Sequence, residues 1–208
     1  MCPYTLGVDV AERGPNGTLR TGIFSPILER NIVVPASRAK IFSTLQDRQP
    51  KVVFNVFQGE SRDVADNIHL GRVEIPVPAK PAGEVAVECR FSYDVNGLLE
   101  VDLHVLATGE RRQLVIIDED EPSGDGLEAR RAALARLKFH PRDADPNRAA
   151  LARAKRCYES FVGDRRERIG DAMAAFEGAL DLQDPRAAEL ARKDLLTALD
   201  ALEGESFL

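Results

Sequence analysis

The chain has 208 residues, of which 44% are hydrophobic, and its 34 acidic and 28 basic side chains give a net charge of −6. This composition is too apolar for a disordered chain, and the acidic balance argues against a nucleic-acid binder, which usually carries a basic surface. No run of about 18 apolar residues predicts a membrane span, no signal segment opens the chain, and three widely spaced cysteines favour a reducing cytoplasm over a secreted disulfide framework.

The first 117 residues contain short runs in which apolar residues alternate with polar ones or stand side by side. Both patterns are typical of strands, with one or both faces buried. The runs lie at residues 8–10, 32–34, 52–57, 85–91, 99–105 and 114–117. Asn96-Gly97, between two of them, readily takes the positive φ angles of a tight hairpin. The sequence therefore predicts an antiparallel β-sandwich over residues 1–117.

Residues 118–126 read DEDEPSGDG, an acidic stretch with one proline, two glycines and no apolar residue. This composition indicates a solvated hinge between two parts of the chain. A calcium-binding loop is the alternative interpretation. The stretch lacks the regular alternate-ligand spacing and the closing glutamate of such a loop, so the hinge is favoured.

Beyond the hinge the apolar spacing becomes helical, and alanine and arginine dominate. A first helix is expected over residues 127–139, before Pro141, and three more are expected around residues 150–161, 169–180 and 184–202. Asp184 suits the N-cap of the last helix and Pro185 its first turn. Each apolar stripe can be buried only against its neighbours, so residues 127–204 are predicted to form a helical bundle. The predicted fold class is α+β, a β-sandwich followed by helices.

No catalytic constellation is visible in the sequence. His69, His104 and His140 are scattered, and none stands at metal-ligand spacing with a cysteine. Neither a Gly-x-Ser-x-Gly elbow nor a glycine-rich phosphate loop is present. These patterns favour a binding module over an enzyme.

Several motifs occur in a fixed order along the sandwich region. They are YTLGV at residues 4–8, PILERN at 26–31, IFST at 41–44, VFQGE at 56–60 and FSYDVNGLL at 91–99. In this order they resemble the substrate-binding domain of DnaK-type seventy-kilodalton heat-shock chaperones. The Cys2-Pro3-Tyr4 opening and the element at residues 140–143, HPRD, are similar to the HscC-like branch of that family.

The resemblance implies a chaperone fragment that holds extended hydrophobic segments of unfolded polypeptides in a channel between sandwich loops, under a helical lid. It places these channel residues: Val8, Val10, Ala11, Phe42, Ser43, Leu45, Gln49, Val52, Phe54 and Val87. It also implies a lid latch at Asp47. The family's arginine partner falls near Ala82 in this sequence, and Lys80 is the basic residue close by.

The resemblance also implies partners and a cofactor. The partners are unfolded apolar peptides, the chain's own ATPase domain and a J-domain co-chaperone, with no nucleic acid and no membrane. ATP would bind the ATPase domain, which these 208 residues do not include, and no cofactor is expected in this fragment. The fragment itself is therefore not expected to be an enzyme.

The sequence departs from the better-known DnaK pattern at several positions. Phe54 stands where the family usually has a smaller aliphatic residue, and residues 12–22 resemble a lengthened loop. The first departure predicts a shallower pocket or a preference for smaller side chains. An alternative function stays open beside the chaperone. In it, Leu45 and Phe54 fill the channel themselves, and the protein docks a folded partner on the sandwich edge or the helical bundle.

Overall fold

A computed structural model describes residues 1–14, 18–117, 127–135, 138 and 140–204 of the chain. One set of strands comprises β1 (Leu6–Arg13), β2 (Leu19–Leu28), β4 (Lys51–Gln58) and β5 (Ile68–Pro76). The other comprises β3 (Ala36–Ser43), β6 (Ala86–Tyr93), β7 (Leu99–Val105) and β8 (Arg111–Ile116). The helices are α1 (Leu127–Ala135), α2 (Asp145–Ser160), α3 (Asp164–Asp181) and α4 (Pro185–Gly204), with short 3-10 turns at Val64–Asp66 and Pro141–Asp143.

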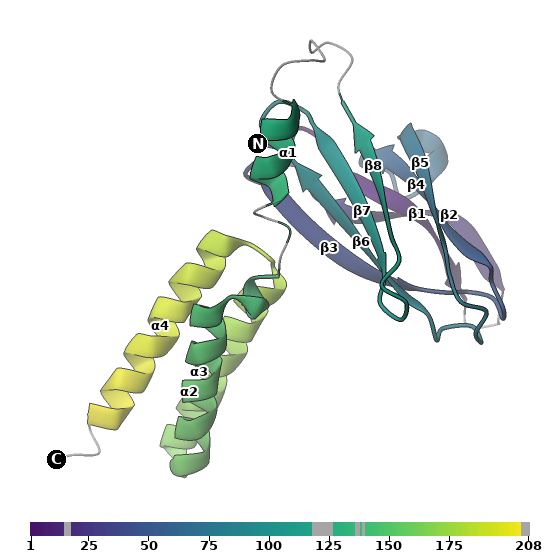
Figure 1. The fold of residues 1–208 in the computed structure, drawn as a ribbon. Helices are drawn as coiled ribbons and strands as arrows, with labels where there is room; N and C mark the ends of the chain where they lie inside the picture. The colour runs from purple at the N-terminus through teal and green to yellow at the C-terminus, as the bar shows by residue number, and fades with distance from the viewer. Residues whose placement is uncertain (15–17, 118–126, 136–137, 139, 205–208) are drawn as a thin grey trace. The chain divides into compact units, whose positions relative to one another are not determined.

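The strands form two four-stranded sheets with antiparallel pairing, ordered β2-β1-β4-β5 and β3-β6-β7-β8 (Figure 1). The helices follow the sheets in the chain, so the predicted α+β class is confirmed. Pro26 lies in β2, an edge strand of its sheet. An edge position suits proline, because a missing N–H costs least there.

The hydrophobic core of the sandwich comes from the alternating faces of its strands. In β7, Leu99, Val101, Leu103 and Val105 are buried, as the alternation predicted. Phe91 of β6 is fully buried and is paired with Val101. Because successive side chains of a strand point to opposite faces, one face of this sheet enters the core and the other carries polar groups.

The turn between β6 and β7 forms where Asn96-Gly97 predicted it. Gly97 has a φ of 83°, in the region that glycine tolerates best. The Asp94 carboxylate accepts hydrogen bonds from the backbone N–H groups of Asn96 and Leu98, each at 2.9 Å. Asp94 is itself buried, so these bonds satisfy a carboxylate that has lost most of its water.

Two sequence expectations about the strands are wrong. Residues 32–34 form no strand, and the Ile32 backbone bonds to other segments instead: its carbonyl accepts from the Cys2 N–H at 2.9 Å and its N–H donates to the Glu29 carbonyl at 3.4 Å. Residues 12–22 are not one long loop, because β1 and β2 stay paired as far as Arg13 and Leu19. Residues 15–17 lie outside the described part.

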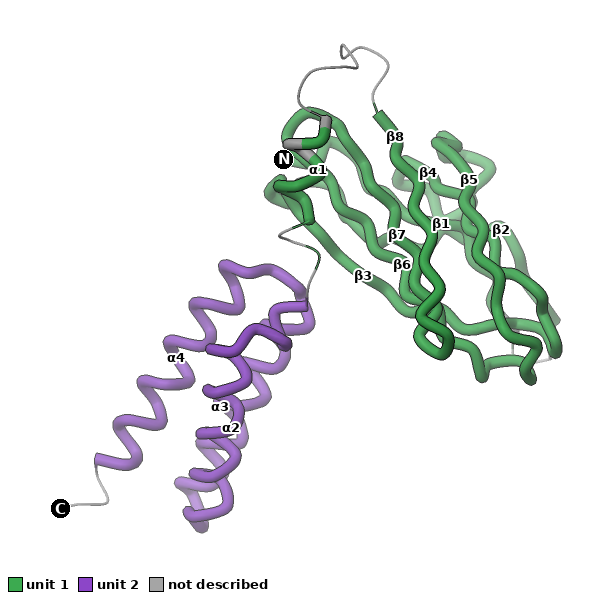
Figure 2. Tube along the Cα trace, in the orientation of Figure 1, with its two compact units in different colours: residues 1–138 green, residues 139–208 purple. Residues whose placement is uncertain are grey.

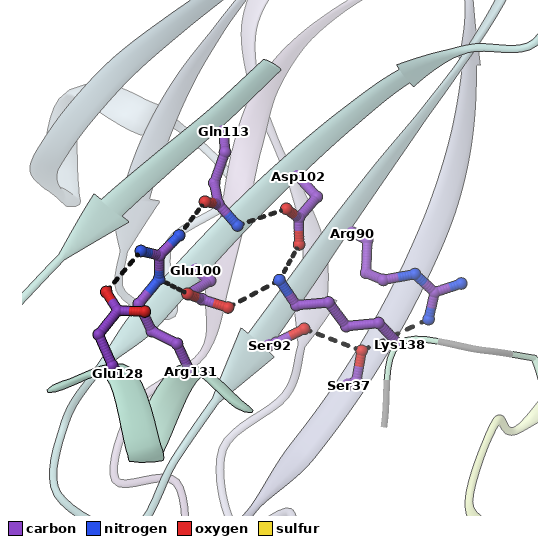
Figure 3. Close-up of polar contacts among 9 residues, drawn as sticks. All are labelled: Ser37, Arg90, Ser92, Glu100, Asp102, Gln113, Glu128, Arg131 and Lys138. Carbon is purple, nitrogen blue, oxygen red and sulfur yellow. Dashed lines mark hydrogen bonds and ion pairs between the residues drawn. The ribbon is translucent and has the colours of Figure 1, made fainter. Parts of the chain in front are cut away.

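The helix α1 is held to the outer face of the sheet by charge (Figure 3). Arg131 Nε lies 2.7 Å from Glu100 Oε1, and Lys138 Nζ lies 2.7 Å from Glu100 Oε2 and 2.6 Å from Asp102 Oδ2. The Glu100 side chain is only 1% exposed. A carboxylate this deeply buried needs such partners, because an unpaired buried charge is very costly.

A neighbouring strand completes this cluster. Gln113 of β8 donates to Asp102 at 2.7 Å and accepts from Arg131 at 2.5 Å, and Glu128 pairs with Arg131 at 3.2 Å (Figure 3). Among the α1 side chains whose burial is described, Leu134 is buried, at 1% exposure. The first helix was expected over residues 127–139, and of these residues 136, 137 and 139 lie outside the described part.

The chain divides into two compact units between Lys138 and Phe139 (Figure 2). The first unit contains the sandwich together with α1, whereas the sequence had grouped residues 127–204 as one helical part. The ion pairs of Glu100 give a physical reason, because they join Arg131 of α1, and Lys138 beyond the end of that helix, to β7.

The second unit contains α2, α3 and α4, which pack on one another as their apolar stripes predicted. Its core is the following set of buried residues: Ala150, Ala154, Cys157, Ile169, Phe176, Leu180, Ala188, Leu195, Leu199 and Leu202. Asp184 caps α4 as predicted, since its carboxylate accepts from the Arg186 N–H at 2.8 Å. None of the helices in the described ranges is long and apolar enough to cross a membrane.

Candidate functional site

A groove of about 530 Å³ lies at one end of the sandwich, where β1 and β3 end and β2 and β4 begin. Eight of the predicted channel residues line it: Val10, Ala11, Phe42, Ser43, Leu45, Gln49, Val52 and Phe54. Residues that the sequence reasoning did not assign also line it: Asp9, Thr21, Gly22, Ile41, Thr44, Lys51 and Val53. The groove therefore gathers segments from both sheets.

Two phenylalanine rings of the groove lie against each other. The Phe42 and Phe54 ring centroids are 5.3 Å apart with an interplanar angle of 62°, an edge-on arrangement that aromatic pairs favour. Phe42 comes from β3 and Phe54 from β4, so the contact joins the two sheets. Phe54 is 2% exposed and belongs to the sandwich core, whereas Phe42 is half-buried against that core.

The remaining two predicted channel residues lie in the core. Val8 and Val87 are both 0% exposed and neither lines the groove. They belong to the same hydrophobic cluster as Phe54. Val8 is paired with Val56 and Val87 with Phe42, so both stand on inward-facing positions of central strands.

Polar groups surround the apolar part of the groove. Asp9 is held by Asn55, whose backbone N–H and side-chain amide donate to its two carboxylate oxygens at 3.0 and 2.9 Å. Lys51 pairs with Glu74 at 2.8 Å, and this hydrogen bond and charge lower the pKa of Glu74. The groove is thus apolar at its base and charged at its edge.

The loop between β3 and β4 is held by Gln49. Its side-chain oxygen accepts from the N–H groups of Leu45 at 3.1 Å and Gln46 at 3.4 Å, and its amide donates to the Lys51 carbonyl at 2.9 Å. One side chain thereby fixes both ends of the loop. The Thr44 hydroxyl, in a residue that is 4% exposed, has no hydrogen-bond partner among the described residues.

These residues fall within a match to a known family. A model of the family described as Hsp70 protein matches residues 8–205. The chain belongs to the Hsp70 family. The match covers the sandwich, the groove and the helices, so membership suggests a chaperone substrate-binding domain.

The two residues expected to latch the lid in this Hsp70 chain lie near each other. The Asp47 carboxylate accepts from the Ala82 N–H at 2.9 Å, and the Lys80 carbonyl accepts from the Arg48 N–H at 2.8 Å. Both bonds join the β3–β4 loop to the segment before β6. The side chains of Asp47 and Lys80 are exposed, and their role as a latch stays a prediction.

Sequence reasoning missed the part of this Hsp70 groove that comes from β2. Thr21 and Gly22 were assigned to a loop, although they belong to a strand that continues to Leu19. The glycines around residues 14–17 suggested irregular backbone, and the pairing of Glu12 with Arg20 shows only after folding. Lys51 and Val53 are the sequence neighbours of Val52, a predicted groove residue, and this adjacency was the signal that could have identified them as groove residues.

A second, polar cavity of about 460 Å³ lies in the same unit of this Hsp70 chain, near the start of β1. Glu60 accepts there from the Thr5 N–H at 3.0 Å and the Thr5 hydroxyl at 2.9 Å. The bond from the Thr5 N–H lowers the pKa of Glu60. In the described part of the chain, no group of three or more His, Cys, Asp or Glu residues could hold a metal ion.

Proposed function

We propose that this chain is the peptide-holding part of an Hsp70 chaperone, and that its groove binds extended apolar segments of unfolded polypeptides. The observation that supports this most is the groove of about 530 Å³, which has an apolar base and a polar edge within the region matched to the Hsp70 family. The helical region would serve as the lid, with Asp47 and Lys80 as its latch. An ATPase domain outside these 208 residues would use ATP to regulate it.

The chemistry of the groove fits weak, sequence-tolerant binding. An extended peptide exposes backbone donors and acceptors, and each hydrogen bond to the loops contributes about 0.5–1.5 kcal/mol net. One buried aliphatic side chain adds roughly 1.5–3 kcal/mol. A few such contacts, less the cost of ordering the peptide, give affinities on the order of micromolar.

A fluorescent-peptide titration tests this proposal. We expect an extended peptide carrying Val and Leu side chains to bind the chain at micromolar concentrations. Val52 lines the groove and is half-buried, so Val52→Phe fills it and abolishes binding. Val33→Phe is the matched control, because Val33 is 55% exposed and lies at the opposite end of the sandwich, between β2 and β3. Equal binding by wild type and Val52→Phe would show that the peptide binds elsewhere.

The alternative function is a module whose groove is filled by its own side chains and that docks a folded partner. The 2% exposure of Phe54 favours it, whereas the 36% exposure of Leu45 does not. A peptide-array screen separates the two functions. Enrichment of short apolar segments supports the chaperone, and an array without binding supports the docking module.

The finer assignments belong to the same proposal: an HscC-like branch, a J-domain co-chaperone and a cytoplasmic location. The branch is supported by the HPRD element, which is a defined structure at the start of the helical unit. His140 Nδ1 accepts from the Arg142 N–H at 3.1 Å, and Arg142 pairs with Asp181 at 2.9 Å. Co-purification of the full-length protein with J-domain proteins tests the partner.

A further inference from the structure

The base of the groove is closed by an aromatic ring. Phe54 lines the groove, yet the residue is 2% exposed and its ring lies edge-on to that of Phe42. Val8 and Val87, which are 0% exposed, belong to the same cluster and do not line the groove. A side chain that enters the groove therefore meets the two rings before it can reach the core.

This arrangement limits how deeply a bound side chain can be inserted. Protein interiors are packed as densely as organic crystals, so a group that needs extra volume must displace a ring from its rotamer. Phe54 has little freedom to move, because Phe42 lies against it and the buried residues of both sheets surround it. A short side chain gains apolar burial without that displacement.

We propose that Phe54 is the residue that sets side-chain size in the groove, and that the groove selects extended segments with a short apolar residue at the central position. This inference rests on the proposed peptide-binding function. Valine is the preferred central residue, since it buries more apolar surface than alanine and still fits above the rings. Leucine and phenylalanine are disfavoured.

The test uses four peptides that share one extended host sequence and differ only in a central Ala, Val, Leu or Phe. Fluorescence anisotropy measures their affinities for the wild-type chain, which requires no variant to fold. We expect the Val peptide to bind about 10-fold more tightly than the Leu peptide, which corresponds to about 1.4 kcal/mol, and the Phe peptide to bind most weakly.

Phe54→Val removes the ring while keeping a residue suited to a strand, and it is expected to reverse the order so that Leu binds more tightly than Val. Phe57→Val is the matched control. Phe57 lies on the same strand, its ring contacts His69 at 5.2 Å, and it does not line the groove. The control is expected to keep the wild-type order, and thermal melting checks that both variants fold.

The outcomes separate this inference from the function on which it rests. Wild-type binding of the Leu or Phe peptide as tight as that of Val overturns the size limit and leaves peptide binding intact. An unchanged order in folded Phe54→Val overturns the role of that residue. If wild type binds none of the four peptides, the proposed function itself fails.

Discussion

Two regions of the sandwich unit use their side chains in opposite ways. Beneath α1, Glu100 is 1% exposed and is paired with two cations, and hydrogen bonds connect the cluster to β8 (Figure 3). In the groove, the base is apolar and the buried Thr44 hydroxyl has no partner among the described residues. Buried charges specify one arrangement, because any other leaves a charge unpaired. An apolar groove accepts many ligands, because apolar contact has no direction.

The largest effect is expected from breaking the charge cluster. Glu100→Gln keeps the shape of the side chain but removes the charge that faces Arg131 and Lys138. Breaking a buried ion pair costs about 3–5 kcal/mol of stability. We expect a loss of about 3 kcal/mol, because Lys138 retains its ion pair with Asp102. Urea unfolding measures the loss, and hydrogen exchange shows whether the α1 amides become less protected.

Glu128→Gln is the matched control for that experiment. It is the same substitution facing the same arginine, but the Glu128 side chain is 87% exposed. Exposed ion pairs contribute about 0–1 kcal/mol, so little change is expected. If the two variants lose equal stability, burial of Glu100 does not determine the strength of the cluster.

A smaller effect is expected at the groove. Gln49→Ala removes the bonds that Leu45 and Gln46 donate and the one that the Lys51 carbonyl accepts. Because each net bond contributes about 0.5–1.5 kcal/mol and these are exposed, we expect a loss near the lower end of that range. Faster exchange of the Leu45 and Gln46 amides and weaker peptide binding are the readouts. Gln46→Ala, at the exposed residue beside it, is expected to change neither.

The stability contributed by the hydrogen bonds between Thr5 and Glu60, at the end of the sandwich opposite the groove, is expected to depend on pH. The Thr5 N–H lowers the pKa of Glu60 in the folded state. A carboxyl group whose pKa is lower in the folded state stabilises that state at pH values above its unfolded pKa, which is about 4.3 for glutamate. This stabilisation is lost as the pH falls through the folded pKa. Glu60→Gln should therefore lower the melting temperature slightly at pH 7 and not at pH 2. An equal difference at both values would contradict this cause.

No change is expected at Cys89 when α1 is released. Cys89 is 0% exposed in the core between the sheets, and this burial raises the pKa of its thiol. If Glu100→Gln loosens α1 alone, Cys89 should react with an alkylating reagent as slowly as in wild type. Peptide mapping by mass spectrometry measures this at Cys89. Faster labelling would show that the cluster holds the whole sandwich together.

The sequence alone predicted the elements in which apolar and polar side chains alternate with a regular period over a long run. The alternation in β6 and β7, their turn at Asn96-Gly97 and the cap at Asp184 follow from local geometry and appear as predicted. The stripes of α2, α3 and α4 predicted a bundle because each stripe needs a partner. The ordered motifs also predicted a chain of the family that the match confirms.

Tertiary structure alone decided which apolar residues line the groove and which lie in the core. Val8 and Val52 are both valines. Val8 of β1 is paired with Val56 of β4, where both strands are central in their sheet, whereas Val52 lies at the start of β4 and lines the groove. It also decided that α1 belongs with the sandwich, because Arg131 and Lys138 meet Glu100 only after residues far apart in sequence are brought together. The local sequence determines the side-chain periodicity of each helix or strand. Which of those side chains are buried depends on contacts with residues that are distant in the sequence.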